Sequence, residues 1–301
     1  MNRLSTEKRR QVIASLVEGN SIRATVRMTG VAKNTVVKLL VDMGTVCSIH
    51  QDRAMRDLTC ERIQCDEIWA FCYSKNRNVP DGKKGQFGYG DVWTWVGMDA
   101  DTKLVASYRI GSRGTEDASE FMRDLAGRMK HRVQLTTDGY HPYLHAVPSA
   151  FKDDIDYAML VKVYGTATKE EQRRYSPAVC LGEFKQPKIG SPDHQHISTS
   201  YVERQNLTMR MGMRRFTRLT NAFSKKVENL TAAVSLHFMH YNFCRVHQTL
   251  GTTPAVAAGV TDHVWKLDEL IGLLEAAESV SVKRGSYAKT RAVKRAAEIS
   301  E

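Results

Sequence analysis

Apolar residues recur at helical spacing near the start of the chain and predict three short helices. Ser5 and Ser21 are suited to cap the first two, a turn at Gly30 follows, and the third helix is expected over 33–43. The opposite face of this third helix is polar and basic and carries Lys33, Asn34, Thr35 and Lys38. Helix, glycine turn, helix is typical of a helix-turn-helix domain, whose last helix lies in the major groove of DNA. We therefore predict such an all-α domain over 1–45; the alternative is a three-helix cap with no role in DNA binding.

A linker is expected over 46–62, and after it the pattern changes to short apolar runs typical of strands. Strands are predicted at 63–73, 92–99, 104–110, 133–137 and 157–164, and helices at 115–129 and 141–150. Short connections between the first three strands favour an antiparallel meander. Three strands, a helix, a strand, a helix, a strand and then helices is the element order of the ribonuclease-H-like fold. The predicted fold class is therefore α/β, a ribonuclease-H-like mixed sheet flanked by helices, between the all-α N-terminal domain and a C-terminal helical extension.

The second half of the chain is predicted to be mainly helical after one irregular stretch. Residues 165–199 contain several glycines and prolines and no strong periodicity, which is typical of an insertion or a functional loop. Helices are then expected over 199–211, 222–245 and 262–276. The last two of these are the candidate contacts between copies of the chain. We expect a catalytic domain over 63–250, which includes the insertion at about 165–199, and a C-terminal helix with a basic tail over 251–301.

Composition is that of a globular protein. The chain has 301 residues, of which 42% are apolar and 26% charged, and this balance excludes disordered and collagen-like classes. No apolar run approaches the roughly 20 residues that span a bilayer, and the first ten residues lack the apolar region of a signal peptide. We therefore expect a soluble cytoplasmic protein with no membrane partner. The six cysteines form no C-x-x-C pair, so no zinc finger is expected and the thiols are expected to be reduced and mostly packed.

An excess of basic residues makes a polyanion the first partner to consider. Lys plus Arg number 44 against 33 for Asp plus Glu, which gives a formal charge of +11, and nucleic acid ranks ahead of membrane. The excess is concentrated in 1–44, in 200–226 and in the tail from Lys283. The second of these stretches offers arginines that can hold phosphates, namely Arg204, Arg210, Arg214, Arg215 and Arg218. The alternative is a basic protein whose charge has no specific partner.

Three acidic residues occupy the places at which a ribonuclease-H-like nuclease keeps its carboxylates. Asp66 lies in the middle of the first strand, Asp138 at the end of the fourth, and Glu203 on a helix after the fifth. A carboxylate inside an apolar strand is costly unless it is paired, hydrogen-bonded or bound to metal. The ordinary alternatives are an edge strand facing water for Asp66 or Glu67, a turn for Asp138, and a solvated helix face for Glu203. Because strand side chains alternate, Asp66 and Glu67 are expected on opposite faces, and we assign the site to Asp66.

Together these carboxylates predict an oxygen-rich metal site. Such a site suits Mg²⁺, with Mn²⁺ as a substitute, better than zinc. Two ions about 4 Å apart can clamp an in-line displacement at phosphorus, in which water or a 3′-hydroxyl is the nucleophile. His196 and His247 are weaker candidates for a supporting role. The ordinary alternatives are an exposed loop histidine for His196 and a helix cap for His247.

Several strings of residues, spanning about 63–255, resemble the DDE transposases, and most closely the insertion-sequence-one family. They are Cys65-Asp-Glu-Ile-Trp69, Thr137-Asp-Gly-Tyr140, Thr199-Ser-Tyr-Val-Glu-Arg-Gln-Asn206, Tyr241-Asn-Phe-Cys-Arg-Val-His247 and Thr253-Pro-Ala255. The resemblance implies a ribonuclease-H-like catalytic domain in which Asp66, Asp138 and Glu203 bind the metal. It also implies hydrolysis at transposon ends, followed by attack of the freed 3′-hydroxyl on target DNA. The best-known members carry a cysteine-rich zinc segment before the helix-turn-helix, and this chain does not.

The sequence therefore predicts a DNA transposase of an insertion sequence, a cytoplasmic, nucleoid-associated protein of a prokaryote. We expect it to cut double-stranded DNA at element ends and to join the 3′-hydroxyl to target DNA with two Mg²⁺ ions per site. Because two ends are cut and joined together, a homodimer or larger assembly on DNA is expected. The alternatives are a ribonuclease-H-like nuclease that cuts without joining, and a domesticated helix-turn-helix regulator that binds DNA without metal.

Overall fold

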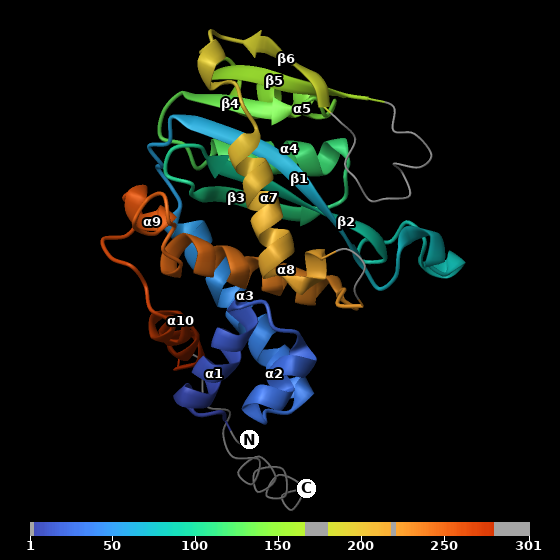
Figure 1. Cartoon of the computed structure of the whole chain (residues 1–301), viewed down its shortest axis with the longest axis vertical. Helices are drawn as coiled ribbons and strands as arrows, with labels where there is room; N and C mark the ends of the chain where they lie inside the picture. The colour runs from blue at the N-terminus through green and yellow to red at the C-terminus, as the bar shows by residue number, and fades with distance from the viewer. Residues whose placement is uncertain (1–2, 166–179, 218–220, 280–301) are drawn as a thin grey trace, which may run out of the picture.

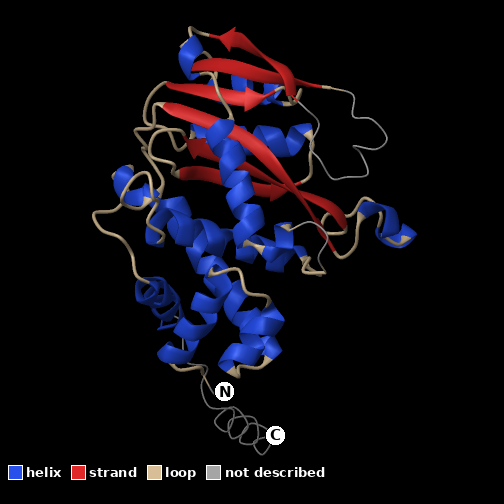
Figure 2. Ribbon diagram, in the orientation of Figure 1, coloured by secondary structure: helices blue, strands red, loops and turns tan. Residues whose placement is uncertain are grey.

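The computed structural model describes residues 3–165, 180–217 and 221–279. Its central feature is a sheet with helices on both faces, and a cluster of N-terminal helices lies beyond one side of this layered body (Figure 1; Figure 2). The long helix α3 (Lys33–Ala54) passes from the N-terminal cluster into the body.

The sheet has six strands in the order β3-β2-β1-β4-β5-β6. They are β1 (Arg62–Cys72), β2 (Gly90–Asp99), β3 (Val105–Gly111), β4 (Val133–Asp138), β5 (Ile155–Tyr164) and β6 (Cys180–Ile189). The first three strands form an antiparallel meander, β4 and β5 continue the sheet parallel to β1, and β6 is antiparallel to β5. A meander on one side of β1 and two parallel strands on the other is the arrangement of the ribonuclease-H-like sheet. The predicted fold class, an α/β mixed sheet flanked by helices, is confirmed.

Helices cover both faces of the sheet because alternate strand residues point to two separate apolar clusters. The covering helices are α4 (Thr115–Ala126), α5 (Tyr143–Phe151), α7 (Ser200–Gly212) and α8 (Val227–Met239). α4 and α5 pack on the face to which Trp95 points, and α7 and α8 pack on the face to which Ile68 points. Alternation along β1 therefore assigns even-numbered residues to the α7 face and odd-numbered residues to the α4 face.

The N-terminal helices are α1 (Thr6–Val17) and α2 (Ile22–Thr29), and each is capped by the predicted serine. The prediction of a linker over 46–62 is corrected for its first part, because α3 continues to Ala54 and packs along α8, and residues 55–61 then connect α3 to β1. Buried Met43, Cys47 and Gln51 extend the inward face of α3 past the expected end of the helix. Gly44 permits the close approach of the two helices, since a Cβ there would lie 2.4 Å from the Cα of Ala232.

The stretch 165–199 was expected to be irregular, and this prediction is wrong for β6. This strand pairs with β5 along the edge of the sheet. Its side chains are mostly exposed, so the apolar alternation that marks a half-buried strand is weak in this sequence. Residues 166–179 of the expected insertion lie outside the described residues.

The C-terminal helices differ in length and role from those expected. α8 ends at Met239, and a π-helical turn (His240–Cys244), the short α9 (Pro254–Ala257) and α10 (Leu267–Ser279) follow. α8 is buried along most of its length between α3 and the sheet, and α10 packs on α1 and α3 (Figure 1). The apolar faces of both helices are buried within this chain, and their contact with a second copy stays a prediction. The basic tail from Lys283 lies outside the described residues.

The thiols and the hydropathy of the helices agree with the sequence analysis. All six cysteines are free, and four of them, Cys47, Cys60, Cys65 and Cys72, are buried. Within the described ranges, no helix combines the length and the apolar character that crossing a bilayer requires.

Candidate active site

Asp66 and Asp138 lie side by side on neighbouring parallel strands at the centre of the sheet. β1 and β4 pair in parallel up to Cys65 and Thr137, and each aspartate directly follows this last pair. Because they take the next position on parallel strands, both point to the face that α7 covers. β4 ends at Asp138, whereas β1 continues to Cys72. The structure therefore brings together two of the three acids predicted from the sequence.

Side chains of β1 fix the first two turns of α7 over these aspartates. The side-chain oxygen of Gln64 accepts hydrogen bonds from the backbone N–H groups of Tyr201 (2.9 Å) and Val202 (3.2 Å). These groups are among the donors that a helix leaves free at its N-terminus. Further along α7, Asn206 Nδ2 donates to Asp66 Oδ2 at 2.8 Å. Gln64 and Asp66 share one face of the strand, so together they set the position of α7 on the sheet.

Glu203 lies beside the aspartates but has partners of its own. Its Oε1 accepts hydrogen bonds from the Thr199 hydroxyl, at 2.6 Å, and from the Lys162 ammonium group. The charge of Glu203 contributes to raising the pKa of both Asp66 and Asp138. Glu203 therefore belongs to the same electrostatic site. It is held at the rim by a lysine, and 42% of its side chain is exposed.

Glu67 joins the two aspartates, although the sequence analysis did not assign it to the site. One carboxylate oxygen from each of Asp66, Glu67 and Asp138 lies within 4.8 Å of the others. Its backbone position directs Glu67 to the α4 face, but β4 ends at Asp138 and leaves space for the Glu67 side chain to reach past the strand end. The side chain is 0% exposed. Strand alternation alone does not detect a contact made beyond the end of the neighbouring strand.

Burial and mutual repulsion raise the pKa of the clustered carboxyl groups. The pKa of Asp66 rises to about 6. Burial is the largest cause of this rise, and the negative charge of Asp138 is the second. The same causes raise the pKa of Glu67 to about 7, and burial raises the pKa of Asp138. Backbone N–H groups act in the opposite direction, since Glu67 N donates to Asp66 at 2.8 Å and Tyr140 N donates to Asp138 at 3.0 Å. Such a cluster favours a bound proton or cation over three free charges.

Arg113 is the cation on the α4 side of the cluster. Its guanidinium lies 3.3 Å from Glu67 Oε2 and rests over the rings of Trp93 and Tyr140, at 4.5 and 4.0 Å from their centroids. The Tyr140 hydroxyl donates to the Arg113 carbonyl oxygen at 2.8 Å. Two aromatic rings thus hold in place the arginine that offsets part of the negative charge.

The cluster fits a hard divalent cation. Carboxylate oxygens from Asp66, Glu67 and Asp138 are the ligand type that Mg²⁺ and Mn²⁺ prefer. Glu67 Oε1 is buried and makes no hydrogen bond of normal geometry in the described part of the chain, although the neighbouring Tyr143 hydroxyl acts to lower the pKa of Glu67. Leaving such an atom without a donor or a cation is costly.

Neither Glu67 nor Asn206 received a role in the sequence analysis. Asn206 lies three residues after Glu203, and this spacing places the two side chains on one face of α7. The signal for Glu67 was a second acid next to Asp66 in an otherwise apolar strand. Spacing therefore points to Asn206, whereas the contact of Glu67 depends on where β4 ends.

The residues predicted to contact DNA are brought together in part. Several of them line one large cavity, namely Lys33, Asn34, Lys38, Arg214 and Arg215. Arg204 is exposed on α7, Arg210 lies near the end of the same helix, and Thr35 is half-buried on α3. Arg218 lies outside the described residues. Two basic stretches that are far apart in the sequence therefore meet at one cavity.

The two histidines predicted to support the site do not meet the carboxylates. His196 lines a shallow cavity with Gln134 at the start of β4, whereas Asp138 is at the end of this strand. His247 lies near Lys103, whose charge adds to burial in lowering the pKa of the histidine. Among the described residues, neither histidine makes a hydrogen bond to the three clustered acids.

Comparisons with known proteins give only remote similarities. No protein-family model matches the chain, and no curated protein matches its sequence. The synaptic complex of piggyBac transposase with hairpin DNA aligns over 96% of this chain and 76% of that one, with 9% identity and a TM-score of 0.39. The Mos1 strand transfer complex aligns over 79% and 76%, with 11% identity and a TM-score of 0.23.

The Mos1 transposase paired-end complex with left transposon end aligns over 50% of this chain, with 13% identity and a TM-score of 0.22. The aligned region spans 58% of that Mos1 chain. TM-scores of this size do not establish a shared fold. The ribonuclease-H-like assignment accordingly rests on the strand order and directions of the sheet itself.

Proposed function

We propose that this chain is a DDE-type DNA transposase of the insertion-sequence-one family. The observation that carries the proposal is the buried cluster of Asp66, Glu67 and Asp138 where the parallel pairing of β1 and β4 ends, with Glu203 beside it on α7. Clustered carboxylates in a strongly basic protein are suited to metal-dependent phosphoryl transfer on nucleic acid. All four of these acids lie in the sequence strings that resemble the family.

Asp66 and Asp138 would hold divalent cations, Mg²⁺ with Mn²⁺ as a substitute, and Glu203 would complete the triad by exchanging Lys162 for metal. When bound, two such ions activate the attacking oxygen and stabilise the leaving oxygen at phosphorus. Asn206 orients Asp66 through its hydrogen bond, and Gln64 fixes the start of α7. Glu67 adds negative charge to the cation site.

The proposed reaction has two steps on double-stranded DNA. Hydrolysis at an element end breaks a P–O bond and frees a 3′-hydroxyl. That hydroxyl then attacks a phosphodiester of the target DNA, so that one P–O bond forms as another breaks. Because two ends are joined in one event, the active form is a homodimer or larger assembly on DNA. The protein works in the cytoplasm of a prokaryote, at the nucleoid.

A strand-transfer assay tests this function. Purified protein is mixed with a target plasmid, Mg²⁺ and labelled duplexes taken from the DNA that flanks the gene. We expect joined products that require the metal and disappear in Asp138→Asn, which removes one charge with little change of shape. Asp81→Asn is the matched control, because the Asp81 side chain is 95% exposed in a loop and takes no part in the cluster.

The other outcomes separate the alternative functions. Metal-dependent cleavage without joining would replace the transposase with a nuclease on the same fold. Binding to authentic ends that needs no metal, with neither cleavage nor joining, would favour a helix-turn-helix regulator.

A further inference from the structure

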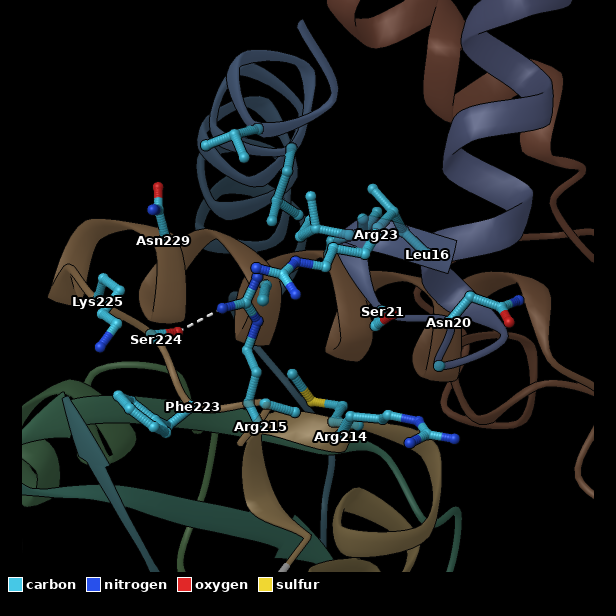
Figure 3. Close-up of a pocket in the computed structure, with 18 of the residues that line it drawn as sticks. Leu16, Asn20, Ser21, Arg23, Arg214, Arg215, Phe223, Ser224, Lys225 and Asn229 are labelled. Atoms are coloured by element: carbon cyan, nitrogen blue, oxygen red, sulfur yellow. Dashed lines mark hydrogen bonds between the residues drawn. The ribbon is translucent and has the colours of Figure 1, made fainter. Parts of the chain in front are cut away.

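A large cavity lies between the helix-turn-helix and the catalytic domain (Figure 3). Its volume is about 1130 Å³. One wall is formed by the end of α1, the turn at Asn20, α2 and the start of α3, and the other by residues 212–215 and 221–237. Figure 3 shows Arg23 and Arg215 extending into this space from opposite walls. The predicted DNA-reading helix therefore faces a basic segment of the catalytic domain.

All charged side chains that line the cavity in the described part of the chain are lysines or arginines. They are Arg23, Lys33, Lys38, Arg214, Arg215, Lys225 and Lys226. Of these, Lys38 alone has a carboxylate partner among the described residues, namely Asp42. Positive charges gathered around one space repel each other unless an anion enters it. The positive charge of its lining therefore favours an anion in the cavity.

Arg215 is a cation that the protein satisfies only in part. Its guanidinium donates to the Ser224 hydroxyl (Figure 3), and the described residues offer it no other acceptor. A guanidinium has five N–H donors, and burial lowers the pKa of Arg215. Ser224 is 2% exposed and bridges to Cys72 at the end of β1. The arginine is therefore fixed to the strand that carries Asp66, and its remaining donors are suited to a phosphate group.

Two helices begin at the cavity without a side-chain cap. α3 follows Ala32, and α8 follows Lys226, and neither residue caps its helix. Lys33 and Lys226, at these two helix starts, both line the cavity. Free backbone N–H groups and the positive end of the helix dipole favour an anion. The helix termini therefore add to the attraction that the lysines and arginines create.

We propose that this cavity binds the phosphate backbone of the DNA end that the active site cuts, so that the helix-turn-helix and the catalytic domain grip one duplex. The choice of DNA as the polyanion rests on the proposed function. α7 connects the two places, because Glu203 lies in its first turn and Gly212, at its end, lines the cavity. From position 203 to 212 the helix rises about 14 Å, which is about four nucleotide steps. The cavity thereby fixes the distance between the bases that α3 reads and the bond that is cut.

Equilibrium binding at several salt concentrations tests this inference. The probe is the flanking-end duplex, and the variant is Arg23→Ala with Lys226→Ala, which removes two exposed cations that have no ion pair in the described chain. We expect binding about tenfold weaker or more, and a slope of log affinity against log salt that is smaller by about two, at roughly 0.9 per lost phosphate contact. The control, Arg123→Ala with Lys130→Ala, removes two exposed cations at the α4 side and is expected to keep the slope.

A second variant tests the arginine itself. Arg215→Lys keeps the charge and loses the planar fork, so we expect several-fold weaker binding with a nearly unchanged salt slope. Circular dichroism and the melting temperature establish that each variant is folded. Wild-type affinity in both variants would overturn the cavity as a DNA site.

The outcomes distinguish this inference from the proposed function. Wild-type affinity and slope in Arg23→Ala with Lys226→Ala, together with normal cleavage and joining, would reject the cavity and leave the transposase intact. A reduced slope in the variant, with no cleavage or joining by the wild-type protein, would keep the cavity as a DNA site and reject the transposase. If Arg23→Ala with Lys226→Ala loses affinity only for an RNA duplex of the same sequence and binds the DNA duplex like the wild type, DNA is rejected as the occupant.

Discussion

Glu67 carries a fully buried carboxylate beside the Tyr143 hydroxyl, and its titration has a consequence for stability. Its pKa of about 7 lies above the ordinary value of 4.5. A carboxyl group whose pKa is raised by folding costs no stability at low pH and destabilises the fold as the pH rises through the raised value. In EDTA, we therefore expect the wild type to lose stability from pH 5 to pH 8 as Glu67 ionises, whereas Glu67→Gln does not. The difference in the free energy of unfolding between the two proteins is expected to grow by on the order of 2 kcal/mol over this range. Urea unfolding across this pH range measures the difference.

Magnesium is the control for this prediction. A cation bound to the cluster neutralises the ionised Glu67, so the gap between wild type and Glu67→Gln at pH 8 is expected to narrow when Mg²⁺ is added. A difference in stability that stays flat from pH 5 to pH 8 in EDTA would show that Glu67 does not titrate in this range.

Asn206 is expected to act on catalysis through Asp66. Asn206→Ala removes the 2.8 Å hydrogen bond to Asp66 Oδ2, and loss of such an orienting partner typically lowers metal affinity or activity about 10- to 100-fold. We expect cleavage to slow by this factor, Mg²⁺ to be required at higher concentration, and DNA affinity to be unchanged. Leu207→Ala, an exposed neighbour on α7, is the control. Normal metal dependence in Asn206→Ala would contradict the orienting role.

At the residue scale, the sequence located the two aspartates from their positions on strands and missed the contact that Glu67 makes with them. Asp66 and Asp138 were found because an acid in an apolar strand and an acid at a strand end are visible in the pattern. Glu203 was found mainly through a string that resembles the DDE transposases, and its pairing with Lys162 was not foreseen. His196 was misplaced because the chain reaches the far end of β4 before it enters α7.

The contact of α3 with α8 joins the two halves of the molecule at the element scale, and Gly44 lies against Ala232 in this contact. Gly44→Ala would place a Cβ 2.4 Å from the Cα of Ala232, a clash that only movement of a helix relieves. Overpacking of this kind costs about 1–3 kcal/mol, so we expect a melting temperature lower by several degrees. Gly272→Ala on α10 is the matched control, because no atom lies within 4 Å of the added Cβ. Its expected effect is a gain of about 0.5–1 kcal/mol from helix propensity.

Elements with a clear buried face were predicted well, and those without one were not. The central strands and α4 alternate or repeat in register with the core, so their positions followed from the pattern. β6 is mostly exposed and lacks that signal. The end of α3 was placed near residue 43 because its later buried positions, which include Gln51, are not all apolar. Its extension follows from packing on α8, a tertiary contact that no local pattern contains.

Across the whole molecule, one apolar cluster runs from the N-terminal helices to the sheet. It includes Val12 of α1, Met43 of α3, Trp95 of the sheet and Leu274 of α10. The division into separate domains that the sequence suggested is therefore not matched by separate cores. A shared core is the physical means by which the helix that we propose to read DNA is held at a fixed distance from the carboxylates. It also predicts that the N-terminal helices and the sheet unfold together.

Leu274→Ala, in the last described helix, tests whether the N-terminal helices and the sheet unfold together. Leu274 is 4% exposed, and its truncation is expected to cost about 2–4 kcal/mol. Because α10 packs on α1 and α3, and α3 enters the body, hydrogen exchange is expected to accelerate together in α1 and in β1. Val264→Ala, at an exposed position before α10, is expected to change neither the stability nor the hydrogen-exchange rates of α1 and β1. Faster exchange in α1 with full protection in β1 would instead mean that the helix-turn-helix opens by itself, and the cavity between the two parts would then be a hinge rather than a fixed DNA site.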